Sequence, residues 1–215
     1  MSELALSQNI VRKSSTHIYG LLWILIAAWF ALVLVLGRND FFVARPGAPP
    51  LALLTAATVP VALFLLSVWL SPSTRDRALT ADLKLATAVQ AWRIGGYSFL
   101  ILSAYNYLPG YFAWPAAVGD MFIGVTAPLL IRKMSNPGFT KSSTFVAWNV
   151  FGILDLVVAI GLGALGVFLI GNAGDVSPTT IMSRMPLVVI PTFFVPTFVV
   201  LHLIALMQAR PSSSR

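Results

Sequence analysis

The chain has 215 residues, of which 58% are hydrophobic and 10% are charged, and its formal net charge at pH 7 is +7. Soluble domains carry about 25% charged residues. This composition therefore excludes an ordinary soluble protein and indicates a polytopic membrane protein. The absence of cysteine excludes disulfides, thiolate metal sites, iron–sulfur clusters and a cysteine nucleophile.

The chain has two histidines, His17 and His202, which do not suffice for a zinc cage or a bis-histidine haem within one helix pair. We therefore expect no metal and no cofactor. The positive-inside rule explains the basic excess, so we do not expect nucleic acid as a partner. The expected partners are the lipid bilayer and a small-molecule substrate, and protein partners are left open.

The apolar runs predict an all-α fold in which one integral membrane domain, residues 1–215, contains a bundle of six transmembrane helices. The predicted spans cover about residues 19–37, 50–70, 87–107, 111–131, 146–170 and 186–207. The first run is longer than the apolar core of a signal peptide, so we expect it to be retained.

Two features modify these spans. The charged stretch of residues 71–84 predicts a short surface helix, with Ser73 or Thr74 as its N-cap. In the sixth span, Pro186, Pro191 and Pro196 remove helix hydrogen bonds and predict a kink.

The distribution of Lys and Arg outside the spans predicts that both termini are cytoplasmic, with a bias of ten residues inside against three outside. The inside set is Arg12, Lys13, Arg75, Arg77, Lys84, Arg132, Lys133, Lys141, Arg210 and Arg215, and the outside set is Arg38, Arg45 and Arg184. We expect a multi-pass protein of a bacterial plasma (inner) membrane. Arg93 is the remaining basic residue, and it lies within a predicted span.

Arg93 and Asp120 lie inside two apolar segments joined by a short hairpin, and a charge at the centre of a bilayer costs about 2.5 to 3.5 kcal/mol. We therefore predict that they are partners. A helical rise of 1.5 Å per residue places Asp120 roughly at the midplane, with Asp155 and Arg93 about 5 Å and His202 about 8 Å to its cytoplasmic side. Four helices thus contribute polar groups to one layer.

Three further polar residues are predicted to face this layer. Gln90, Arg93 and Tyr97 follow i, i+3, i+7 spacing, which puts them on one face of an α-helix. Asn149 and Asp155 lie on either side of Gly152 on the fifth helix, so both can point inward. Small residues in the fourth and fifth spans, among them Gly119, Gly124 and Gly152, predict close helix packing.

Three functions remain open for this polar cluster. The first is a small transporter or membrane binding protein, proton-coupled or for a small anionic substrate, in which Arg93 pairs an anion and Asp120 or Asp155 carries a proton. The second is an intramembrane enzyme acting on a lipid or isoprenoid, with an aspartate as acid and His202 as base. The third is an accessory subunit in which the polar groups only fix helix register. Whether the chain is an enzyme is therefore left undecided.

Overall fold

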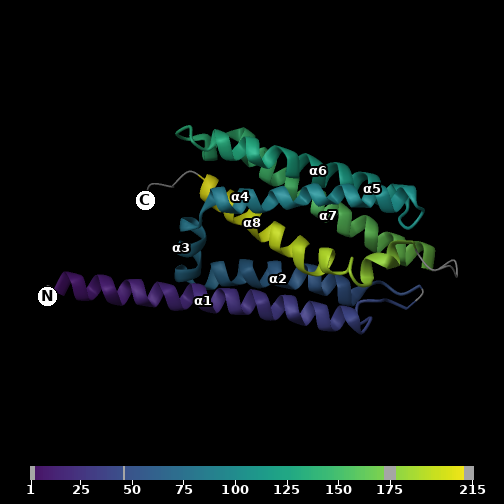
Figure 1. Ribbon diagram of the computed structural model, residues 1–215, viewed down its shortest axis with the longest axis horizontal. Coiled ribbons are helices and arrows are strands. Elements are labelled where there is room, and N and C mark those ends of the chain that lie inside the picture. The colour runs from purple at the N-terminus through teal and green to yellow at the C-terminus, as the bar shows by residue number, and fades with distance from the viewer. Residues whose placement is uncertain (1–2, 46, 172–177, 211–215) are drawn as a thin grey trace.

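The structure is a computed structural model that describes residues 3–45, 47–171 and 178–210. In these residues the chain forms helices and connecting turns without any strand, so the fold is all-α. The long helical segments run along the long axis of the bundle in alternating directions (Figure 1). In chain order they are α1 (Glu3–Arg38); α2 (Leu51–Leu70); α4 (Leu83–Gln90) continued by η1 (Ala91–Gly96) and α5 (Tyr97–Ala104); α6 (Gly110–Lys133); α7 (Ser143–Gly171); and η4 (Ile190–Phe194) continued by α8 (Val195–Ala209). The start of α1 and the end of α8 lie at the same end of the bundle (Figure 1).

Within the part of the chain that the structure describes, four helices are long and apolar enough to cross a membrane, which makes the chain a multi-pass membrane protein. They are Leu51–Leu70, Gly110–Lys133, Ser143–Phe168 and Ile190–Ala209. The apolar part of α1, Leu22–Arg38, is shorter than these four, and the third predicted span is divided between α4, η1 and α5. Six membrane crossings with cytoplasmic termini therefore remain a prediction.

The helix count departs from the predicted six. The described residues form seven helical segments. This count treats α4, η1 and α5 as one segment and η4 with α8 as another, and it omits the short 3-10 turns η2 (Phe139–Lys141) and η3 (Pro178–Ser183). The additional one is α3 (Pro72–Thr80), which confirms the short helix predicted within residues 71–84 and lies across the end of the bundle between α2 and α4 (Figure 1). Its N-cap is Ser71, whose hydroxyl accepts a hydrogen bond from the Thr74 amide at 3.3 Å, and not Ser73 or Thr74.

The third segment changes helix type where it meets α6. Residues Ala91–Gly96 form a 3-10 helix that contains Arg93 and ends in Gly95 and Gly96. Glycine has a low helix propensity, which weakens the regular α-helix here. The backbone of Ile94 also lies against Gly124 of α6 so closely that a Cβ atom at Gly124 would overlap the Ile94 amide nitrogen.

The sixth segment is irregular at its prolines, as the sequence predicts. Residues Ile190–Phe194, which include Pro191, form a π-helical turn, and the regular helix begins only at Val195. Proline has no amide hydrogen to donate, so the hydrogen-bonding pattern of a continuous α-helix cannot pass through these positions.

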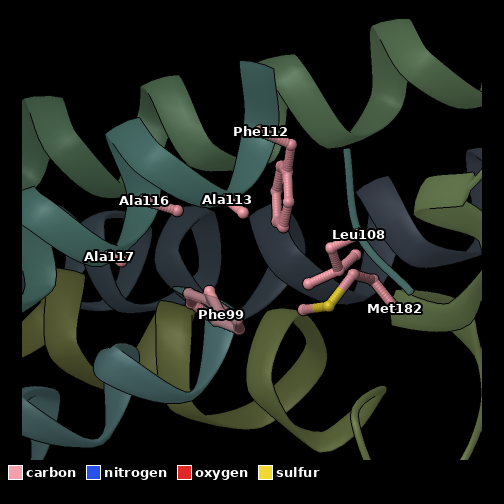
Figure 2. Close-up of a cluster of buried hydrophobic side chains, with 7 residues drawn as sticks. All are labelled: Phe99, Leu108, Phe112, Ala113, Ala116, Ala117 and Met182. Carbon is pink, nitrogen blue, oxygen red and sulfur yellow. The ribbon is translucent and has the colours of Figure 1, made fainter. Parts of the chain in front are cut away.

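Helix α6 and the η4–α8 segment form the centre of the bundle, because 39% and 44% of their apolar windows are buried, against 11% for α2. Figure 2 shows one buried apolar cluster, in which side chains from α6 meet others from α5, η3 and the α5–α6 turn. It consists of Phe99, Leu108, Phe112, Ala113, Ala116, Ala117 and Met182. A second cluster begins on α6 at Ile123. Asp120 lies between the two clusters along α6.

Candidate functional site: a buried Arg–Asp–Asp cluster

The face of the third segment that points into the bundle follows a three-residue spacing. Gln90, Arg93, Gly96 and Phe99 are all buried. A 3-10 helix has three residues per turn, so residues three apart lie above one another. The helix type thus places the arginine of η1 directly between α6, α7 and α8.

The guanidinium of Arg93 is bonded on three sides. Its Nε donates to Oδ1 of Asp120 at 2.7 Å, and its Nη2 donates to Oδ2 of Asp155. Its Nη1 lies 3.2 Å from both the Gly152 carbonyl oxygen and Nε2 of His202. The residue is only 2% exposed. Two carboxylates and two neutral acceptors therefore surround one buried cation.

These contacts define the state of His202. Arginine can only donate, so Nε2 of His202 accepts from Arg93 and the ring proton is on Nδ1. Nδ1 donates to Oδ1 of Asn149 at 2.9 Å, and Nδ2 of Asn149 donates to the Phe145 carbonyl at 2.8 Å. The Trp148 ring packs edge-on against the imidazole, with 5.3 Å between centroids. His202 is therefore neutral, with both ring nitrogens bonded.

Three glycines provide the space for the cluster. A Cβ atom at Gly96 would lie 2.8 Å from a carboxylate oxygen of Asp120. A Cβ at Gly119 would overlap the carboxylate of Asp155, and one at Gly152 would overlap the imidazole of His202. Each polar side chain thus occupies the volume that a larger residue on the neighbouring helix would fill.

The structure brings together five of the residues that the sequence singled out: Arg93, Asp120, Asp155, His202 and Asn149. Gln90 is buried beside them, where Nε2 donates to the Phe198 carbonyl at 3.1 Å and Oε1 has no partner among the described residues.

Tyr97 does not belong to the cluster, because its side chain is 52% exposed. The predicted i, i+3, i+7 face assumes 3.6 residues per turn, whereas η1 has three, so Gly96 takes the place expected for Tyr97. The adjacent Gly95 and Gly96 in an apolar segment were the sequence signal for this change.

Two cavities meet at Asp120. One, of about 160 Å³, is lined by Arg93, Asp120, the two η1 glycines and five apolar residues. The other, of about 50 Å³, is lined by Asp120 and apolar residues that include Met182 of η3. Asp155 lines neither cavity, and its side chain is 8% exposed against 15% for Asp120. Asp120 is therefore the carboxylate that a bound species can reach.

A family model described as Domain of unknown function (DUF8737) matches residues 50–210, which is well over half of the chain. The chain belongs to this family. The matched region contains every residue of the cluster, while α1 lies outside it. Comparisons with curated proteins and with solved structures gave no significant match.

Proposed function

We propose that this protein is a small integral membrane transporter or membrane binding protein whose polar site binds a proton at Asp120. The observation that carries the proposal is an imbalance of charge: Asp120 and Asp155 share the single guanidinium of Arg93. An unpaired charge is expensive to bury in apolar surroundings. With a neutral His202, the site is electrically neutral only when it holds one further positive charge, and a proton is the simplest one.

The positions of the two aspartates support Asp120 as the residue that carries the proton. Asp155 forms a closed pair with Arg93 away from both cavities, whereas Asp120 borders both. A proton on Asp120 would also weaken its bond to Nε of Arg93. A small anionic substrate would have to displace Asp120 from this nitrogen, because Arg93 already donates to the protein on three sides.

The two other functions have less support. The larger cavity supports an enzyme acting on a lipid, because it reaches the flank of the bundle beside Trp92, whose side chain is 72% exposed. However, His202 lines neither cavity and both of its ring nitrogens are bonded, so it is poorly placed to act as a base. A purely structural role would need a closed cluster, whereas Asp120 borders both cavities.

The location that we propose is the inner membrane of a bacterium, with the basic end of the bundle in the cytoplasm. The predicted cytoplasmic residues Arg75, Arg132 and Lys141 belong to α3, the last turn of α6 and η2. These parts of the chain lie at or near the end of the bundle where α1 starts (Figure 1). Fractionation of cells that express a tagged chain would test the location.

Infrared difference spectroscopy tests the proton site without knowledge of the substrate. The protein in lipid bilayers is titrated with acid and base while the carbonyl stretch of a protonated carboxyl group is followed. We expect a band in the wild type that is lost in Asp120→Asn, since this variant leaves a neutral Arg93–Asp155 pair. A wild type without such a band, or a band unchanged in Asp120→Asn, would contradict the proposal.

A further inference from the structure

The wall of the larger cavity is rich in aromatic side chains. Trp92, Phe99, Phe194 and Phe198 line it together with the carboxylate of Asp120. Phe194 and Phe198 stack on each other with 5.9 Å between centroids, and the Phe198 ring already lies 6.0 Å from Cζ of Arg93. Aromatic ring faces attract cations, most strongly where water is excluded.

The charge of the site also favours a cation. Arg93 is balanced by Asp155, so the carboxylate on the cavity wall is the surplus one. A metal ion such as sodium, magnesium or calcium needs several oxygen ligands. Within the described residues, Asp120 is the only side chain on this wall that offers an oxygen. The wall therefore suits a cation that carries its own apolar shell, such as an alkylated ammonium ion.

The cavity volume limits the size of that ion. An apolar cavity of about 150 Å³ accommodates benzene, and this cavity has about 160 Å³. An ammonium ion with small alkyl substituents is of comparable bulk. Access is available from the flank, because the lining residues Trp92 and Gly95 are exposed there.

We propose that the cavity beside Asp120 binds a small monovalent organic ammonium ion in exchange for the proton. This inference rests on the proposed function and names its substrate class. The Asp120 proton leaves to solvent as the ammonium ion enters, so the site carries the same total charge in both states. The aromatic rings then hold the alkyl groups while the carboxylate holds the charge.

Calorimetric titration of the purified full chain with tetramethylammonium chloride tests the exchange, with sodium chloride as the control for ionic strength. We expect saturable binding that releases one proton for each ion bound, measured from the dependence of the heat on buffer ionisation. Asp120→Asn should lose binding and proton release together.

Two matched pairs separate charge recognition from simple apolar binding. Choline should bind while its uncharged isostere, 3,3-dimethylbutan-1-ol, should not. Trp92→Leu should weaken tetramethylammonium binding by about 2- to 30-fold, the range of one cation–π contact. Trp69→Leu should leave it unchanged, because Trp69 is 80% exposed on α2 and lines neither cavity. Both tryptophans are largely exposed, so these variants should fold even if Asp120→Asn does not.

Equal binding of the alcohol and choline, or equal effects of the two tryptophan substitutions, would overturn the inference. A wild type that shows the protonated carboxyl band but binds no tetramethylammonium would also overturn it and leave the proposed function intact. A wild type that shows neither the protonated carboxyl band nor tetramethylammonium binding would overturn both the proposed function and this inference.

Discussion

At the scale of single residues, Arg93 holds the site together because it is the common partner of Asp120, Asp155 and His202. Breaking a buried ion pair by removing one partner costs about 3 to 5 kcal/mol, because the other charge is left uncompensated. Removal of Arg93 would leave the Asp155 carboxylate unpaired and would also take away the donor bonded to Asp120, so we expect a cost within this range.

We therefore expect Arg93→Gln to reduce the yield of folded protein severely, as measured by size-exclusion chromatography in detergent. Combining it with Asp155→Asn should recover part of the loss, since this second substitution removes the carboxylate that Arg93 had neutralised. The control is Arg184→Gln. Arg184 and Asp40 form an ion pair at 3.8 Å in which both side chains are 57% exposed. Loss of this exposed pair should change the free energy of unfolding by about 0.5 kcal/mol or less. If Arg93→Gln folds as well as Arg184→Gln, the pairing does not hold the fold.

The glycines of the site make a second prediction at this scale. Gly152→Ala would drive a methyl group into the His202 imidazole and displace it from Arg93 and Asn149, at a cost of about 1 to 3 kcal/mol. Gly161→Ala on the same helix meets no atom within 4 Å and should leave stability unchanged or slightly raised. Thermal unfolding of the two variants in the same detergent checks the difference, and equal melting temperatures would contradict the packing described for His202.

At the scale of the element, the sequence predicts the site where the helices are regular. Asp120, Asp155 and His202 lie on α-helices, and the 3.6-residue period brings all three toward Arg93. The prediction for Tyr97 is wrong because η1 has three residues per turn. In η1 the Ile94 backbone also lies against Gly124 of α6, a contact between segments that periodicity within one segment cannot reveal.

Because η1 has three residues per turn, its two adjacent glycines should tolerate substitution to different degrees. Gly96→Ala should push Asp120 away from Arg93 and lower the unfolding temperature, whereas Gly95→Ala meets nothing within 4 Å and should not lower it. In a regular α-helix continued from Arg93, Tyr97 rather than Gly96 would face Asp120. A Gly96→Ala variant as stable as Gly95→Ala would argue against the 3-10 geometry.

At the scale of the whole molecule, long apolar runs determine the fold class, because residues in a bilayer must satisfy their backbone hydrogen bonds within a helix. The run of residues 50–70 predicts α2 to within a residue. The cavities could not be predicted in the same way. They lie where residues far apart in sequence, such as Trp92, Asp120 and Phe194, meet at irregular segments η1 and η4.

The alternating direction of the segments makes the predicted topology testable on the whole chain. The chain has no cysteine, so a single introduced cysteine is the only site for a thiol reagent. If the basic end of the bundle is cytoplasmic, Ser73→Cys and Ser143→Cys should resist a membrane-impermeant reagent in intact cells and react after lysis. Asn39→Cys and Tyr105→Cys lie in exposed positions at the ends of α1 and α5, so they should react in intact cells. The reverse labelling pattern would mean that the protein has the opposite orientation in the membrane. Labelling of one residue from each pair would mean that the α4–η1–α5 segment does not cross.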